Sequence, residues 1–446
     1  MTILIIALVA LGVCALLVAV HRWLWIRLVR DTTAPGGLPR RVGTALTIAL
    51  PLLSVAALTA GRAGAPFWLQ QTVSWPGYLW LAVLLYLTLT MLVAEPIRAL
   101  LLRRLAHRDP SGAVAAPPSA HSAPSSGTPE SGTATATATA SSSSAGAGAE
   151  PGAVLAADGA PRRAVPAAPG GGLSRRTFVA RTVGGAAAAV ALGTVGNGAY
   201  GVLRGPRVRR VQVPLAKLPR AAHGFRIAVV SDVHLGPVLG RAHAQRIVDT
   251  VNRTQPDLIA IVGDLVDGSV PDLGPAAEPL RGLTARHGSF FVTGNHEYFS
   301  GAEQWVEHVR ELGLTPLENA RRALPHFDLA GVNDIQGERE GSGPDFQAAL
   351  GDRDRTRAAV LLAHQPVVIH DAVRHGVDLQ LSGHTHGGQL WPGNFLAELA
   401  NPTVAGLERY GDTQLYVSRG AGAWGPPVRV GAPSDITVVE LASYQA

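Results

Sequence analysis

A histidine pair in a glycine-rich turn decides how the second half of this chain is interpreted: Gly383-His384-Thr385-His386-Gly387-Gly388. The five residues at 377–381 (VDLQL) alternate apolar and polar side chains, which is the pattern of a β-strand. A strand end that feeds such a turn holds side chains rigidly and lets a ligand approach the backbone. Two histidines placed in this way can reach neighbouring metal ions, provided the turn re-aims one of them. A lone pair is more often solvated or structural, so the rest of the chain decides.

Four earlier segments share this design, in which a short apolar strand runs directly into Asp, Asn or His. In chain order they are FRIAVV-SDVH (225–234), LIAIV-GD (258–264), SFFV-TGNHE (289–297) and AVLL-AHQP (359–366). One such ending arises by chance. Five endings in one order are not expected of histidines that merely pack in a core, and they indicate one shared site.

Taken together, the series Asp-x-His, Gly-Asp, Gly-Asn-His-Glu, His and Gly-His-Thr-His resembles the calcineurin-like metallophosphoesterases. The resemblance covers residues 225–441 and leaves out the first half of the chain. It implies an α/β domain in which a two-sheet β-sandwich is flanked by helices (αββα). It also implies two divalent metal ions, with manganese, iron and zinc as the candidates, and hydrolysis of a phosphoric ester.

By the same resemblance, the five blocks supply a complete set of metal ligands. The set is Asp232, His234 and His386 for the first ion, Asn295, His364 and His384 for the second, and Asp264 as the bridge. The residue types agree with this chemistry, because hard divalent ions prefer oxygen ligands and imidazoles. The neutral carbonyl oxygen of Asn295 also limits the negative charge next to an anionic substrate.

Further residues are candidates by position. His296 is implied to steady the transition state or to protonate the leaving oxygen, and the alternative is a supporting role only. Arg419 resembles a feature of membrane-anchored members and is expected to contact phosphate, unless it is a surface arginine. Asp267 either supports the site or caps the next turn, and Trp391 and Trp424 either line a cleft or pack. Seven other histidines are expected to be structural or solvated: His223, His243, His287, His308, His326, His370 and His375.

Composition points to a membrane protein. The 446 residues are 47% hydrophobic and only 16% charged, and the mean hydropathy is +0.19, which is unusual for a soluble protein. The formal net charge is +6. Lys217 is the only lysine, so the basic residues reflect an arginine-rich compositional bias, and no nucleic-acid partner is expected. Cys14 is the only cysteine, which excludes a disulfide within the chain.

Residues 1–108 are expected to contain three transmembrane helices. The uncharged apolar runs at 3–20, 42–60 and 78–94 are each close to the length that crosses a bilayer core of about 30 Å. No basic segment precedes the first run, so it is interpreted as an anchor and not as a cleaved signal peptide. Tryptophans and tyrosines between the runs suit the membrane interface. A transporter is disfavoured, because the runs carry no charge that would form a polar pathway.

Residues 109–172 are rich in Ala, Ser, Thr, Gly and Pro, and they are predicted to be a disordered linker. Residues 173–206 follow, and their Ser174-Arg175-Arg176-Thr177-Phe178-Val179 resembles a twin-arginine translocation signal. A mildly apolar run at 183–203 comes next. It is expected to be a fourth transmembrane helix, and the alternative reading of the arginines is an ordinary pair flanking that helix.

Arginines follow the first and third runs and precede the second and fourth. The positive-inside rule then places these flanks in the cytoplasm and residues 207–446 outside it, on a bacterial cell membrane. Four arginines do not fit this orientation, because they lie just past the fourth run, on the outer side of the membrane. Acidic lipid head groups are their expected partners there. They are Arg204, Arg207, Arg209 and Arg210.

Residues 207–446 are expected to form one domain in which strands alternate with helices at 242–252, 276–285 and 302–312. Later strands are expected at 327–332, 414–418 and 436–441. The leading hypothesis is a membrane-anchored phosphodiesterase, with a lipid-linked phosphoester among its candidate substrates. The alternatives are a phosphomonoesterase or nuclease of the same fold, and a membrane sensor that binds a phosphorylated ligand without turnover. The sequence leaves the oligomeric state open.

Overall fold

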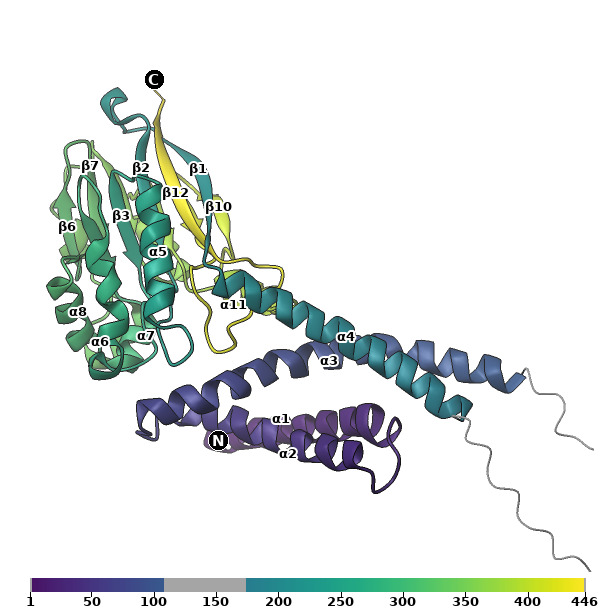
Figure 1. Ribbon diagram of the computed structural model, residues 1–446. Helices are drawn as coiled ribbons and strands as arrows, with labels where there is room; N and C mark the ends of the chain where they lie inside the picture. The colour runs from purple at the N-terminus through teal and green to yellow at the C-terminus, as the bar shows by residue number, and fades with distance from the viewer. Residues whose placement is uncertain (1, 108–173, 445–446) are drawn as a thin grey trace, which may run out of the picture.

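The computed structural model describes residues 2–107 and 174–444 (Figure 1). The linker predicted at 109–172 lies outside the described residues, as do the predicted domain boundaries at 108 and 173. The described part consists of long N-terminal helices and a globular domain. Figure 1 shows the domain standing at one end of these helices, with α4 leading directly into it.

The apolar runs of the first half form four long helices. They are α1 (Thr2–Leu24), which continues as a π-helical stretch over Trp25–Arg30, α2 (Leu38–Thr59), α3 (Phe67–His107) and α4 (Arg175–Leu203). All four are long and apolar enough to cross a membrane. α3 is much longer than the apolar run at 78–94, because the helix continues through Pro76 and Pro96 into its arginine-rich flank.

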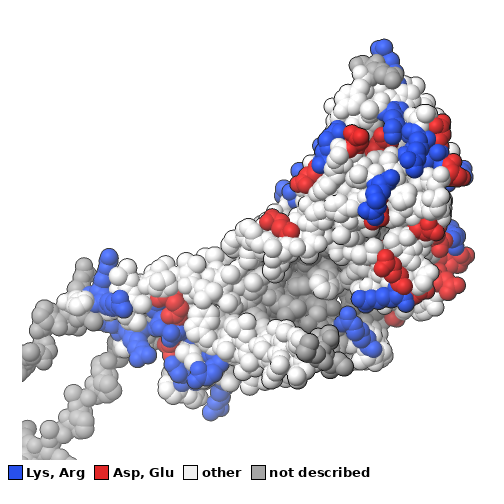
Figure 2. Space-filling model, turned by 180° about the vertical axis from the view of Figure 1, so that it is seen from behind, with Lys and Arg blue, Asp and Glu red and all other residues white. Residues whose placement is uncertain are grey.

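The arginine-rich ends of these helices lie together. Arg27 pairs with Glu95 of α3, with Nε 2.5 Å from Oε1, and Arg181 of α4 donates to the carbonyl of Thr32 at 2.9 Å. Figure 2 shows arginines gathered at the end of the helices that points away from the globular domain, and a broad uncharged surface along the helices. Most of the positive charge of the four helices therefore lies at one common end, and Arg62, after α2, and Arg204, after α4, are the exceptions.

Two six-stranded mixed sheets form the globular domain. The first has the order β1-β12-β2-β3-β4-β5, with β2, β3, β4 and β5 parallel. Its strands are β1 (Arg207–Leu215), β2 (Phe225–Val230), β3 (Leu258–Val262), β4 (Ser289–Val292), β5 (Thr315–Pro316) and β12 (Asp435–Ser443). The second has the order β10-β11-β9-β8-β7-β6. Its strands are β6 (Ala320–Ala323), β7 (Phe327–Gly331), β8 (Ala358–Leu362), β9 (Leu379–Ser382), β10 (Gly406–Tyr410) and β11 (Thr413–Val417).

The sheets pack face to face around one apolar core, and helices cover their outer faces. Alternate residues of the central strands, such as Ile227 and Leu329, fill the layer between the sheets and are fully buried. The outer face of the first sheet packs against α5 (Arg241–Arg253), α6 (Val270–Ala277) and α8 (Ala302–Glu311). That of the second packs against α9 (Phe346–Leu350) and α10 (Ile369–Arg374). The predicted helix-flanked two-sheet sandwich is confirmed.

One helix of the domain differs from its prediction. A helix was expected at 276–285, whereas α6 occupies Val270–Ala277 and a 3-10 turn follows at Glu278–Gly282. Pro271 lies in the first turn of α6, where proline is favoured because its missing N–H would be unpaired there. Pro279 cannot donate to an α-helical ladder, so the helix ends before it.

The globular domain packs directly against α3 and α4. Val428 belongs to the same apolar cluster as the buried faces of these helices, and Leu390 and Val430 pack against it. Tyr86 of α3 donates its hydroxyl to the carbonyl of Trp391 at 2.9 Å. Gly198 of α4 lies so close that a Cβ there would be 2.8 Å from the carbonyl oxygen of Arg429. The loops that contact the helices are thus the loops next to the histidine pair.

Candidate metal centre

The predicted ligands come from turns that follow β2, β3, β4, β8 and β9. Five of the eight described non-glycine residues with positive φ belong to this set, with φ between 49° and 73°: Asp232, His234, Asp264, His384 and His386. Left-handed backbone is uncommon for any residue but glycine, even though Asp and His adopt it more readily than most, and such strain concentrates at functional sites. The turns are therefore shaped to aim these side chains, at the expense of local backbone energy.

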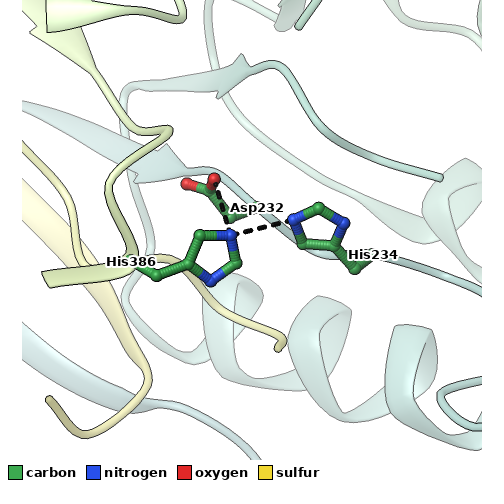
Figure 3. Close-up of side chains that lie close together, drawn as sticks. All are labelled: Asp232, His234 and His386. Carbon is green, nitrogen blue, oxygen red and sulfur yellow. Dashed lines mark hydrogen bonds and ion pairs between the residues drawn. The ribbon is translucent and has the colours of Figure 1, made fainter. Parts of the chain in front are cut away.

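The first group of side chains is Asp232, His234 and His386. All three are buried, and Figure 3 shows their polar atoms pointing toward one another, with Asp232 and His234 on the loop after β2 and His386 on the loop after β9. His386 Nε2 lies 3.0 Å from His234 Nε2 and 3.3 Å from Asp232 Oδ1. One ligand atom from each residue lies within 4.8 Å of the others, which is close enough for a single ion to bind all three.

The second group is Asp264, His364 and His384, whose ligand atoms also lie within 4.8 Å of one another. His364 Nε2 is 3.1 Å from Asp264 Oδ2. Asn295 joins this group, because its Oδ1 lies 3.0 Å from His384 Nδ1. Asp264 Oδ2 is also 3.8 Å from His234 Nε2, so this carboxylate lies between the two groups. The structure thus brings all seven predicted ligands together.

Glycines let these loops approach one another. A Cβ on Gly383 would overlap Ser231 Oγ and Asp232 Oδ2, so the histidine turn can lie against Asp232 only without a side chain there. A Cβ on Gly294 would overlap Asp264 Oδ1. In return, Asp264 Oδ1 accepts a hydrogen bond from the backbone N–H of His296 at 2.9 Å. Close packing of backbone against carboxylate fixes both aspartates.

Glu297 holds two of the turns together, and its role was not predicted from the sequence. Its carboxylate is completely buried and accepts hydrogen bonds from three backbone N–H groups. The donors are Asp264 N at 2.9 Å, Leu265 N at 2.7 Å and Gly294 N at 2.6 Å. Burial and the neighbouring Asp264 raise the pKa of Glu297 to about 7 despite these donors. Glu297 therefore ties the turn after β3 to the start of α7 (Asn295–Ser300).

Asp267 contacts two histidines and does not merely cap a turn. Its Oδ1 lies 2.9 Å from His234 Nδ1 and 2.6 Å from His296 Nδ1. Burial opposes ionisation, but the two histidines more than offset it and lower the pKa of Asp267 to about 2. Despite its own burial, His234 has its pKa raised to about 9, mainly by Asp267. The carboxylate fixes both rings and leaves His296 Nε2 free of this contact.

Arg429 supports the other histidine of the first group. It is buried, and burial lowers its pKa to about 10. Its guanidinium donates to the carbonyls of Gly422 and His386, at 2.6 and 3.0 Å, and Nη2 lies 3.0 Å from His386 Nδ1. Since the backbone of Arg429 also packs against Gly198 of α4, His386 is linked by one residue to the helical part of the chain.

The chemistry of the donor set fits two divalent metal ions. Carboxylate, amide and imidazole donors are the ligands that manganese, iron and zinc share. His364 Nε2 is buried without a hydrogen-bond partner and faces Asp264, so a cation between the two would satisfy both. Asp232, His234 and His386 would hold one ion, Asn295, His364 and His384 the other, and Asp264 lies within reach of both.

The weaker candidates occupy different places. Arg419 lies at the edge of the centre, with Nη1 3.8 Å from Asp435 Oδ2, and it lines a cavity of about 330 Å³ together with Trp391. Trp424 lies over His296, with ring centroids 5.8 Å apart. Among the other histidines, His243 is buried and neither ring nitrogen has a hydrogen-bond partner. His223 Nδ1 accepts from the N–H of Ser443.

Known proteins are similar to part of this chain. The family model described as calcineurin-like phosphoesterase matches residues 225–388. A zebrafish (Danio rerio) transmembrane protein with metallophosphoesterase domain is 41% identical over 53% of this chain and 57% of its own length. Uncharacterised metallophosphoesterases of Helicobacter pylori (strain J99) and Bacillus subtilis are 38% and 31% identical. They align over 56% and 61% of this chain and over 68% and 98% of their own lengths.

The fold, the ligand set and these relatives define a class of metal-dependent phosphoester hydrolases. The chain belongs to the calcineurin-like metallophosphoesterases. It spans less than two thirds of the zebrafish relative. Among solved structures, a dimetal phosphatase from Danio rerio is 13% identical, covers 49% of this chain and 93% of its own, and has a TM-score of 0.36, a similarity too weak to add to the assignment.

Proposed function

We propose that this chain is a membrane-anchored enzyme that hydrolyses phosphodiester bonds with two divalent metal ions. The observation that carries the proposal is the convergence of two buried ligand groups on Asp264, whose Oδ2 lies 3.1 Å from His364 Nε2 and 3.8 Å from His234 Nε2. Manganese, iron and zinc all suit these ligands, and manganese is the first to test. Such a pair of ions supplies charge neutralisation for the phosphate and a nucleophilic hydroxide near neutral pH.

The chain's own residues would orient the substrate and move the proton. Because Asp267 binds His296 through Nδ1 at 2.6 Å, His296 Nε2 is the atom that would donate a proton to the leaving oxygen. The His296 side chain is 15% exposed, so a substrate can reach it. General acid catalysis of this kind is worth about 10²–10⁴-fold in rate. Arg419 would contact a non-bridging phosphate oxygen from the adjacent cavity.

Membrane anchoring and orientation are part of the proposal. The arginine-rich ends of the four helices lie together, away from the globular domain (Figure 2), and the positive-inside rule assigns that end to the cytoplasm. The catalytic domain would then be extracytoplasmic, on a bacterial cell membrane. The twin-arginine-like segment forms the first turn of α4, where Ser174 Oγ accepts from the N–H of Thr177 at 3.1 Å. This position is compatible with an export signal that remains as a helix.

The test compares esters on the purified full chain in nanodiscs supplied with manganese. The proposal expects turnover of bis-p-nitrophenyl phosphate, and loss of that turnover with EDTA and with Asp264→Asn. The matched control is Asp249→Asn, an exposed aspartate on α5, which should keep the parent rate. Faster turnover of p-nitrophenyl phosphate would make the chain a phosphomonoesterase, and cleavage of DNA would make it a nuclease. Binding of these esters without any turnover would favour the alternative of a membrane sensor.

A further inference from the structure

The helix that follows the histidine turn exposes a large apolar face. No residue of α11 (Gly393–Ala400), all of which the structure describes, is buried. Phe395, Leu396 and Leu399 are 56%, 72% and 85% exposed, and Trp391 just before the helix is 51% exposed. Monomeric soluble proteins rarely expose contiguous apolar side chains of this size, so these residues mark an interaction surface.

The opposite face of α11 is polar and borders a cavity. Asn394 and Glu398, which are four residues apart and so lie on one side of the helix, line the cavity of about 330 Å³ that also contains Arg419. Glu398 is the only charged residue of α11. α11 therefore has the pattern of a helix that lies flat in a membrane interface, with apolar side chains toward the acyl chains and polar ones toward the protein.

The surroundings of α11 indicate which surface covers it. Val430, which lines the α11 cavity, and its bridge partner Leu390 pack against the apolar cluster of α3 and α4. The Trp391 carbonyl accepts a hydrogen bond from the hydroxyl of Tyr86 in α3. A second hollow shares Val430 and Gly431 with the first and is lined by Asn197 and Tyr200 of α4. α11 thus begins directly after residues that contact the helices apolar enough to cross a membrane.

We infer that α11 and Trp391 insert into the surface of the same bilayer, and that the cavity behind α11 receives the head group of a lipid-borne phosphoester. The inference rests on the proposed anchoring and deepens the proposed phosphodiesterase activity. Gly387, which follows the ligand His386, lines this cavity together with Arg419. A phosphate held there would lie beside the metal ligands while its hydrocarbon chain remains in the bilayer.

Insertion is tested on the full chain, with Cys14→Ser removing the only native cysteine. Leu399→Cys carries an NBD fluorophore, in nanodiscs of phosphatidylcholine and phosphatidylglycerol that hold one chain each. The inference expects a blue-shifted emission that lipids with doxyl-labelled acyl chains quench. Glu303→Cys, at an exposed position on α8, should emit as in water. Water-like emission at position 399 in nanodiscs overturns the inference, and a blue shift only in crowded vesicles assigns the face to a second copy of the chain.

The cavity is tested by pairing a soluble and an amphiphilic phosphodiester. Leu396→Asp combined with Leu399→Asp should keep the rate on bis-p-nitrophenyl phosphate within twofold. The same variant should lose at least tenfold on p-nitrophenyl hexadecyl phosphate in the nanodisc. If the variant keeps the same fraction of the parent's rate on both esters, the assignment of the cavity is overturned. If the parent hydrolyses neither ester, the proposed function fails, while the NBD measurement still decides whether α11 lies in the bilayer.

Discussion

Between pH 7.5 and pH 5, the parent should lose about 2 kcal/mol more unfolding free energy than a variant in which phenylalanine replaces His243. His243 lies on α5, is 1% exposed and has no hydrogen-bond partner at either ring nitrogen. Burial, with smaller contributions from Arg246 and Arg429, lowers its pKa from 6.5 to about 3. The folded domain therefore holds this ring neutral, whereas the unfolded chain protonates it below pH 6.5.

The sign and size follow from this difference. Because the folded-state pKa is depressed, the contribution of His243 is intact above pH 6.5 and is lost as the pH falls from 6.5 toward 3. pH 5 lies about 1.5 units below the unfolded-state pKa of His243. Protonation therefore stabilises the unfolded chain there by about 2 kcal/mol, at 1.36 kcal/mol per unit. For a domain of ordinary stability, about 5–15 kcal/mol, this loss is easily measured.

The assay is denaturant unfolding of the full chain in detergent, followed by near-UV circular dichroism at pH 7.5 and pH 5. The quantity of interest is the change in unfolding free energy between the two pH values, so a constant packing effect of His243→Phe cancels. His370→Phe, at an exposed position, is the control and should keep the parent's pH dependence. If His243→Phe loses as much stability on acidification as the parent does, within about 0.5 kcal/mol, the burial argument is wrong.

Three further predictions concern the centre and the orientation of the chain. Asp267→Asn should reduce manganese affinity or turnover about 10–100-fold. It should also change the pH–rate profile, because His234 and His296 lose their shared carboxylate. Unchanged values in the manganese titration and in the pH–rate profile would refute this. Gly294→Ala should abolish stoichiometric manganese binding in mass-spectrometric metal analysis, because the added Cβ overlaps Asp264 Oδ1, whereas Gly240→Ala, where the Cβ meets open space and φ is −107°, should retain it. The third prediction uses Asp352→Cys in a Cys14→Ser background, because the Asp352 side chain is 82% exposed. The new cysteine should react with a membrane-impermeant maleimide on intact bacterial cells. Reaction only after lysis would reverse the proposed orientation.

Local patterns in the sequence were sufficient to predict the five strands that end in candidate ligands, whereas β1, β5, β6 and β10 were not predicted. Four of these strands are short, mainly apolar runs and the fifth, at 377–381, alternates apolar and polar residues. The candidate ligands follow within four positions of each strand end, so a local pattern marked them and the family resemblance gave them their roles. The helix pattern was less decisive: at 276–285 apolar periodicity competed with Pro279, and the helix ended before that residue.

The supporting residues could not be predicted in the same way. Asp267 meets His296 only because β3 and β4 are neighbours in the sheet, and Arg429 reaches His386 from a loop 43 positions away. Nothing in the local sequence of Arg429 distinguishes it from the surface arginines of an arginine-rich chain. Glu297 stood in the Gly-Asn-His-Glu block, but its three backbone partners depend on how two turns pack against each other.

Asp264 lies between the two ligand groups and would hold both ions of a pair. Electron paramagnetic resonance of the full chain loaded with manganese tests this most directly, because two ions about 3.5–4 Å apart give an exchange-coupled signal. The account predicts two manganese ions per chain with a coupled spectrum that Asp264→Asn removes. A spectrum of isolated manganese ions, or loading below one ion per chain, would contradict it.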